Sequence, residues 1–245
     1  MAVIKEMMKL ALIVIVIGLP PYLVALKAFQ EELSFKIKIL LSIIYWAGTF
    51  YTQQALPFIL IIIILIKKYK NQKSSEEFLG EIQGEKKFSF KDFIIVAGAT
   101  ILIRFPIGIF NIIYIFILDL LGVKIQGQEV INIFVNSQNK LFSILLMLLV
   151  VVVAPLNEEF SMRHWLFGKI LSPKIGIILG AIISSSLFTL LHYNVAGIPT
   201  FFILGLFACY IYQKKGLWGA VTVHFIFNLS SIIFLFIAKS LIPLA

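Results

Sequence analysis

The sequence contains few charged residues and a single cysteine, and each shortage excludes a class of protein. Charged residues make up 13% of the 245 positions, and Cys209 has no second cysteine to pair with. A disulfide framework and a cysteine-rich metal site within one chain are therefore excluded. Hydrophobic residues reach 60% instead, and the mean hydropathy is +1.02. Several apolar runs attain the roughly 20 residues that span a hydrocarbon core, so the composition predicts an integral, polytopic membrane protein.

Acidic residues are also scarce, and the resulting excess of positive charge needs an explanation. Asp and Glu number 12 against 21 Lys and Arg, which gives a formal net charge of +9. The lysines cluster at the ends of apolar runs, so membrane topology explains this charge better than nucleic-acid binding does. We therefore predict the lipid bilayer, and no nucleic acid, as a partner. The positive-inside rule puts the amino terminus and the 67–91 loop in the cytoplasm. The heavy usage of Ile and Lys is typical of an AT-rich bacterial genome, so we expect a bacterial plasma membrane.

The apolar runs predict an all-α fold with about seven transmembrane helices. We expect residues 1–139 to form an amino-terminal part that includes a linker at 67–91, and residues 140–245 to form a carboxyl-terminal four-helix core. Two of the helices have potential breaks, near Gln53-Gln54 and near Arg104-Phe105-Pro106, so a count of eight or nine is the alternative. The expected helices are at about 8–26, 38–66, 92–121, 141–171, 175–194, 199–213 and 216–238.

Polar side chains interrupt three of the expected helices in the second half of the chain. Members of each pair are four positions apart and so share one helix face. Counted at about 1.5 Å per residue, the three polar faces reach overlapping depths. Ionisable groups in a bilayer cost about 2.5–3.5 kcal/mol each, which makes such a cluster a functional site by default. The pairs are Glu159 with Arg163 (preceded by Glu158), Phe188 with His192, and His224 with Asn228.

The residue types in this cluster suit water activation. A low-dielectric cavity destabilises the charge of a glutamate, which makes Glu158 a better proton acceptor and the candidate general base. His192 beside it can hold the same water. His224 and the amide of Asn228 can donate hydrogen bonds to the oxyanion that forms when water attacks a peptide carbonyl. Arg163 is the counter-charge that lets a second carboxylate stay ionised in the membrane. Together these side chains predict a peptidase.

At these residues the chain resembles the CPBP intramembrane proteases, also called the Abi or CAAX-protease family. The resemblance covers roughly residues 140–240, and the amino-terminal part carries no family motif. One departure is His164, which stands where many members look to have glycine. The family motifs occur here, in order, as Glu158-Glu159 with Arg163, Phe188 with His192, and His224 with Asn228.

The resemblance implies hydrolysis of a peptide bond in or near the membrane. Family substrates range from prenylated CAAX tails to bacteriocin and pheromone precursors, so the implied partner is a peptide or a lipidated protein. We expect water activation without a metal, and a zinc ion held by Glu158, His192 and His224 is the alternative. The residues implied for catalysis are Glu158, His192, His224 and Asn228, supported by Glu159 and Arg163.

Three further residues are candidates for the surroundings of the site: His164, Phe188 and Arg104. Arg104 lies at about the depth of Glu158, so it is expected to contact a motif glutamate or a substrate carboxylate, or else backbone carbonyls freed by Pro106. Two other functions stay open. A catalytically silent scaffold or immunity protein would keep the same residues. A transporter would use buried ionisable groups as a relay, but no inverted repeat is visible.

Overall fold

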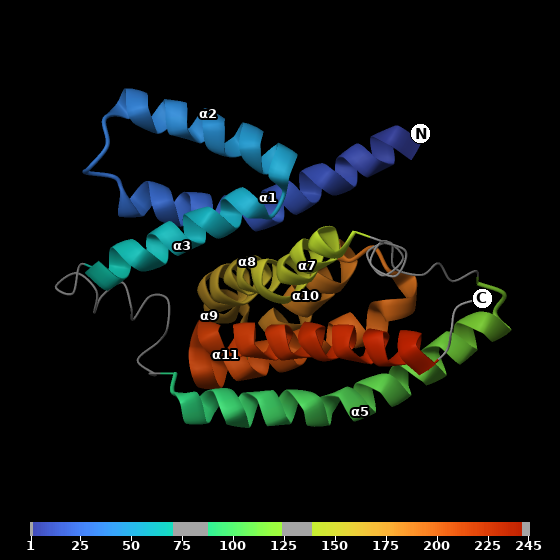
Figure 1. Ribbon diagram of the computed structural model, residues 1–245. Helices are drawn as coiled ribbons and strands as arrows, with labels where there is room; N and C mark the ends of the chain where they lie inside the picture. The colour runs from blue at the N-terminus through green and yellow to red at the C-terminus, as the bar shows by residue number, and fades with distance from the viewer. Residues whose placement is uncertain (1, 71–87, 124–138, 242–245) are drawn as a thin grey trace.

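The computed structural model describes residues 2–70, 88–123 and 139–241, and every regular element within these ranges is a helix (Figure 1). The all-α fold class is therefore confirmed. In chain order the elements are α1 (Ala2–Ala28), α2 (Phe35–Thr52), α3 (Ala55–Lys70), α5 (Phe90–Leu120), α7 (Lys140–Leu148), the π-helix η1 (Leu149–Val153), α8 (Ala154–Glu159), the π-helix η2 (Phe160–Leu171), α9 (Ser172–Ile175), α10 (Ile177–Leu191), the 3₁₀ turn η3 (Val195–Gly197) and α11 (Ile198–Leu241).

Four helical stretches of the described chain are long and apolar enough to cross a membrane, judged by length and composition. Their outer faces carry large apolar side chains, and Leu102, Ile112 and Leu141 are among the most exposed. A lipid surrounding accommodates such faces, which water would not. The protein is thus an integral membrane protein. The four stretches are Glu6–Ala28, Phe90–Leu120, Lys140–Ile175 and Val195–Ile237, and two shorter apolar helices are Ala55–Lys67 and Ile177–Leu191.

The helix expected at 38–66 is in fact two helices, so the prediction of a single span there is wrong. The chain breaks at the first of the two potential sites, between the end of α2 and the start of α3. Gln53 adopts a φ of 53°, in the left-handed region that ends helices. Its backbone N–H still bonds to the Thr49 carbonyl at 2.7 Å, while that of Gln54 bonds to Thr52 at 2.7 Å. The chain therefore turns sharply and brings Gln54 to the head of α3.

The second potential break does not occur, because α5 runs through Pro106 without interruption. A capping box starts this helix: the Ser89 hydroxyl accepts from the Asp92 backbone N–H, and the Asp92 carboxylate accepts from Ser89. Lys215 in α11 donates to the same carboxylate. The beginning of α5 is thereby fixed against α11.

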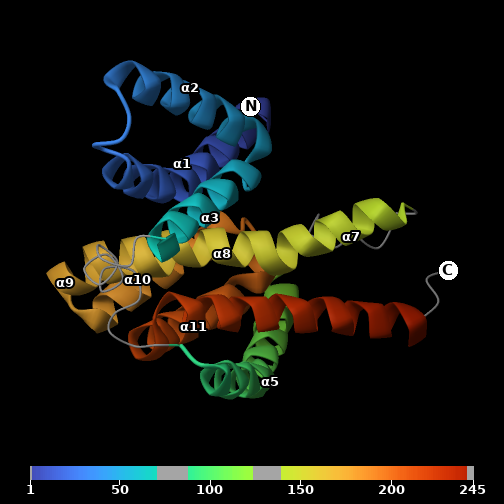
Figure 2. The same ribbon diagram turned by 60° about the vertical axis from the view of Figure 1, so that its left-hand side comes forward.

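Gly216 divides α11 into the two helices that were expected at 199–213 and 216–238. Its φ of 68° and ψ of −164° are not helical, and glycine reaches them without steric cost. The two halves form one continuous element around this kink. The kink allows the second half of α11, which carries His224 and Asn228, to run alongside α8, which carries Glu158 (Figure 2).

Helices pack on both sides of a central rod that runs from α7 to α9 (Figures 1 and 2). Helices α1 to α3 lie on one side of the rod, and α11 lies on the other with α5 against it. One apolar cluster joins the first group to the rod and to α11 through Val24, Ile61, Phe160 and Leu217. Another cluster, with Val96 and Val223 among its members, joins α5 to α11.

The packing bears on the expected domains without fixing their boundary. α5 was grouped with residues 1–139, yet it packs chiefly on α11 of the expected core. The linker expected at 67–91 falls mostly on residues 71–87, which lie outside the described residues. Its two ends are helical, since α3 reaches Lys70 and α5 begins at Phe90. The division at residue 139 stays a prediction.

Close packing of α10 against α11 at Gly205 gives a stability prediction. A Cβ at Gly205 would lie 2.9 Å from the Ser185 Cβ and 3.1 Å from its Cα, so backbone would have to move. We expect Gly205→Ala to cost about 1–3 kcal/mol through overpacking. Gly98→Ala is the matched control, because a Cβ there meets nothing within 4 Å. Thermal unfolding of both variants in one detergent checks this, and equal midpoints would contradict it.

Candidate active site

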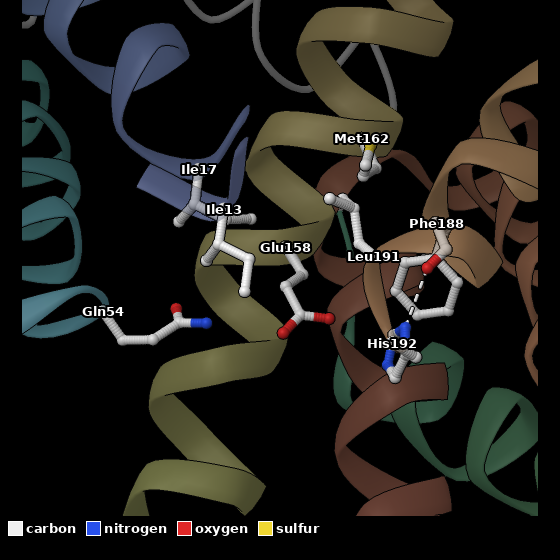
Figure 3. A pocket seen from close by; sticks show the side chains of 8 residues that line it. All are labelled: Ile13, Ile17, Gln54, Glu158, Met162, Phe188, Leu191 and His192. Atoms are coloured by element: carbon white, nitrogen blue, oxygen red, sulfur yellow. Dashed lines mark hydrogen bonds between the residues drawn. The ribbon is translucent and has the colours of Figure 1, made fainter. Parts of the chain in front are cut away.

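A cavity of about 100 Å³ lies between the amino-terminal helices and the central rod (Figure 3). Glu158 occupies its middle, with Gln54 on one side and His192 on the other. The other walls are apolar. The cavity thus brings together two of the predicted catalytic residues and one residue that was not predicted. Its lining consists of Ile13, Ile17, Gln54, Glu158, Met162, Phe188, Leu191 and His192.

The two adjacent glutamates face different surroundings because neighbouring residues of a helix point about 100° apart. Glu158 keeps 18% of its side chain exposed and reaches into the cavity. Glu159 is 1% exposed and points toward α11. The first carboxylate can therefore meet water, whereas the second needs a partner inside the protein.

Glu159 finds two buried partners. One oxygen lies 3.1 Å from Nε of Arg163, and the other lies 2.8 Å from Nδ1 of His224. The Arg163 guanidinium covers the face of the Phe188 ring, with 4.1 Å from its central carbon to the ring centroid. In the described part of the chain, its other nitrogens have no hydrogen-bond partner. Electrostatic attraction to Glu159 and to the ring therefore holds this arginine.

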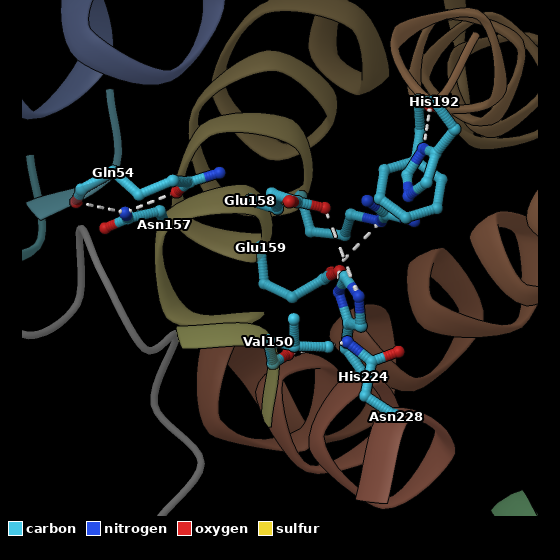
Figure 4. A network of polar contacts seen from close by, with 10 residues as sticks. Gln54, Val150, Asn157, Glu158, Glu159, His192, His224 and Asn228 are labelled. Carbon is cyan, nitrogen blue, oxygen red and sulfur yellow. Dashed lines mark hydrogen bonds and ion pairs between the residues drawn. The ribbon is translucent and has the colours of Figure 1, made fainter. Parts of the chain in front are cut away.

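His224 links the two glutamates (Figure 4). Its Nδ1–H donates to Glu159, and its Nε2 faces Glu158 with 4.0 Å to the nearer oxygen. The ring is 3% exposed, so its nitrogens need partners inside the protein. Each nitrogen faces one of the two glutamates, and the ring therefore joins Glu158 to Glu159.

His192 presents a lone pair rather than an N–H to the cavity. Its Nδ1 lies 2.8 Å from the Phe188 backbone carbonyl, which can only accept, so Nδ1 carries the hydrogen. In the neutral ring Nε2 is then an acceptor. The Phe201 ring stacks on the imidazole at 3.9 Å between centroids and fixes its plane. His192 can therefore accept a hydrogen bond from a water beside Glu158.

Asn228 makes a contact that its sequence position did not reveal. The Ala154 backbone N–H bonds to the Leu149 carbonyl in the π-helical pattern, and the next N–H in that pattern would come from Pro155, which has none. The Val150 carbonyl is left without a helical donor. The amide of Asn228 supplies one at 2.8 Å, which anchors α11 to η1 and leaves one amide hydrogen free.

The residues expected around the site lie at different places. Phe188 is buried between Arg163 and the two motif histidines. His164 is buried on the side of η2 that faces α11, with Nδ1 3.1 Å from the Tyr212 hydroxyl. Its bulk is accommodated by Phe160, which packs on the ring.

Arg104 has other partners than the expected glutamate. It donates to the Phe227 carbonyl at 2.7 Å and to the hydroxyls of Ser230 and Ser231. Its guanidinium also covers the Phe227 ring. A backbone carbonyl was the alternative expectation, but this one belongs to α11 and is not freed by Pro106. Arg104 therefore acts on the turn of α11 that contains Asn228.

Sequence reasoning missed Asn157 and Gln54. Asn157 is fully buried, and its Nδ2 donates to the Gln54 backbone carbonyl at 2.8 Å and to the Gln54 Oε1 at 2.6 Å (Figure 4). A signal was available for both, since an amide within an apolar span marks a hydrogen-bonded contact between helices. The pairing itself spans 103 positions, which no local pattern reveals.

The alternative of a zinc site does not fit the donors that the structure brings together. Among the described residues, no group of three or more His, Cys, Asp or Glu side chains is arranged to hold a metal ion. We therefore derive no step through a metal.

Comparison with known proteins extends the motif resemblance. The comparisons with curated proteins and with solved structures gave no match. A family model described as type II CAAX prenyl endopeptidase, Rce1-like, matches residues 140–230, which include every motif residue from Glu158 to Asn228. This match confirms the resemblance to the CPBP, or CAAX-protease, family: the segment 140–230 of the chain is similar to the Rce1-like endopeptidases.

Proposed function

We propose that the protein is an intramembrane endopeptidase that hydrolyses a peptide bond of a membrane-associated protein or peptide precursor. The observation that carries this proposal is the shared cavity, in which the Glu158 carboxylate and the lone pair of His192 face one another. The family match supports peptide hydrolysis. It also favours a substrate with a lipidated, CAAX-like tail or a small peptide precursor. The amino terminus in the cytoplasm and a bacterial plasma membrane belong to the same proposal.

In the proposed mechanism, water between Glu158 and His192 is the nucleophile. Glu158 takes a proton from this water while the water oxygen attacks the peptide carbonyl carbon. The carbonyl π electrons move to the oxygen, which becomes an oxyanion. His224 and the free amide hydrogen of Asn228 stabilise that charge. When the intermediate collapses, the C–N bond breaks and Glu158 returns the proton to the departing amine.

Glu159 and Arg163 support this chemistry by holding His224. The hydrogen bond from Nδ1 of His224 to Glu159 fixes the orientation of the ring. Arg163 compensates the charge of Glu159 from the other side and holds this carboxylate in place. The proposed catalytic set is thus preorganised by a buried chain of charges.

Replacing Glu158 by Gln tests the general base. The amide keeps the size of the side chain but cannot accept the proton, so turnover should fall by at least about 100-fold. The measurement is cleavage of an internally quenched, farnesylated peptide with a CAAX ending by the purified protein. Glu6→Gln, a change at an exposed glutamate, is the control and should cleave normally. Undiminished turnover by folded Glu158→Gln protein would contradict the assignment.

Replacing Arg163 by Met tests the buried ion pair. Removal of one partner leaves Glu159 charged and uncompensated, so we expect a loss of about 3–5 kcal/mol of stability and a lower yield. Lys9→Met removes the lysine of an exposed pair with Glu6 and should cost at most about 1 kcal/mol. Thermal unfolding in detergent compares the two variants. Similar small losses in both would mean that the buried pair contributes little.

Replacing Asn228 by Ala separates its two hydrogen bonds. Loss of the bond to Val150 should destabilise the protein by about 1–3 kcal/mol. Loss of the second hydrogen should lower turnover by about 100-fold with a nearly unchanged KM, if it stabilises the oxyanion. The measurements are an unfolding midpoint and the kinetics of the folded fraction. A lower midpoint with normal turnover would leave Asn228 as an anchor of α11 only.

A further inference from the structure

Gln54 enters the cavity from outside the segment that matches the protease family. It lies in the turn between α2 and α3, whereas the match begins at residue 140. The turn is formed at Gln53, which has a positive φ, and two hydrogen bonds from Asn157 to Gln54 hold it against α8. Asn157 immediately precedes Glu158, so the same turn of α8 positions both the proposed base and Gln54.

The hydrogen bonds of Asn157 fix which end of the Gln54 amide points into the cavity. A backbone carbonyl can only accept, so the group of Asn157 that meets the Gln54 carbonyl is its NH₂. The same nitrogen lies 2.6 Å from the Gln54 side chain, which must therefore present its oxygen there. The Nε2 end is then directed away from Asn157. Figures 3 and 4 show it on the side of Glu158.

The polar lining of the cavity consists of two acceptors and one donor. Glu158 is an acceptor when ionised, and His192 offers its Nε2 lone pair because Nδ1 is bonded to Phe188. The remaining five lining side chains are apolar. Gln54 Nε2 is thus the donor group of the lining, and no hydrogen bond of the described residues engages it as a donor. A half-buried NH₂ group of this kind is a binding site for a carbonyl oxygen.

We propose that Gln54 is a catalytic residue that donates a hydrogen bond from Nε2 to the carbonyl oxygen of the scissile peptide. This proposal rests on the proposed endopeptidase function. The two acceptors orient the attacking water, and the donor holds the oxygen on which negative charge develops. His224 and Asn228 lie on the other side of Glu158 (Figure 4), so Gln54 approaches that oxygen from the opposite direction. The amino-terminal helices thereby complete the active site.

Two variants remove the Nε2 donor of Gln54 while keeping a hydrogen bond between Asn157 and the turn. Gln54→Met is neutral and has no amide, and Gln54→Glu keeps an oxygen for Asn157. In both, the backbone carbonyl of residue 54 still accepts from Asn157. We expect kcat for the quenched, farnesylated CAAX peptide to fall about 100-fold in both variants, with KM nearly unchanged. A merely structural residue would lower the unfolding midpoint and leave the kcat of folded protein intact.

A tetrahedral analogue supplies the second readout. A peptide phosphinate should bind Gln54→Met about 100-fold more weakly than wild type, because the phosphinate oxygens occupy the place of the oxyanion. The matched control is Gln53→Asn, since Gln53 is exposed in the same turn and asparagine tolerates its positive φ. That variant should retain both kcat and phosphinate affinity.

The outcomes separate this proposal from the function on which it rests. Peptide cleavage by wild type that is lost in Glu158→Gln but normal in Gln54→Met would overturn the Gln54 role alone. Unchanged phosphinate affinity in folded Gln54→Met would overturn it as well. Absence of cleavage by wild type, or cleavage that survives in Glu158→Gln, would overturn the proposed mechanism and the Gln54 role together. A fall in kcat and in phosphinate affinity, with Gln53→Asn normal, is the supporting result.

Discussion

The buried attraction between Glu159 and Arg163 is the constraint on which the rest of the site depends. Neither side chain is exposed, and an isolated charge in such a place would cost several kcal/mol. The pair fixes the rotation of the helix from α8 into η2, because both charges must face the same interior. That rotation points Glu158 the other way, toward the cavity. Compensation of one carboxylate thus determines where its neighbour meets water.

The turn of α11 from His224 to Asn228 makes three polar contacts with the surrounding helices. His224 bonds to Glu159, Asn228 bonds to the Val150 carbonyl, and the Phe227 carbonyl accepts from Arg104. Each contact provides a hydrogen-bond partner for a polar group that cannot bond to water in a hydrocarbon environment. The π-helical stretch η1, which precedes α8, makes one of these contacts necessary, since the donor for its Val150 carbonyl would be the backbone nitrogen of Pro155, which has no hydrogen. The irregular backbone and the motif asparagine therefore belong to one arrangement.

How far the sequence could predict the site depends on the range of the contacts involved. Pairs four residues apart, such as Phe188 with His192, follow from helical periodicity and were predictable. So was the membrane environment, from composition alone. The partner of Arg104 and the clasp between Asn157 and Gln54 were not, because they join residues more than 100 positions apart. At 38–66 the single helix was wrong, whereas the alternative of a break at Gln53-Gln54 was correct. Apolarity predicts burial in lipid but could not decide between the two, because the turn depends on the φ of one residue, Gln53.

The division of labour within the molecule follows from these contacts. The segment that matches the protease family supplies the glutamates, the histidines and Arg163. Buried contacts from Arg163 and His224 to Glu159 join these side chains. The walls that close the cavity come in part from Ile13 and Ile17 of α1 and from Gln54, all outside that segment. Apolar walls and an amide add no charge to the site. Under the proposed function, the amino-terminal helices therefore shape the space that a substrate enters, while the charged residues of the matched segment carry the chemistry.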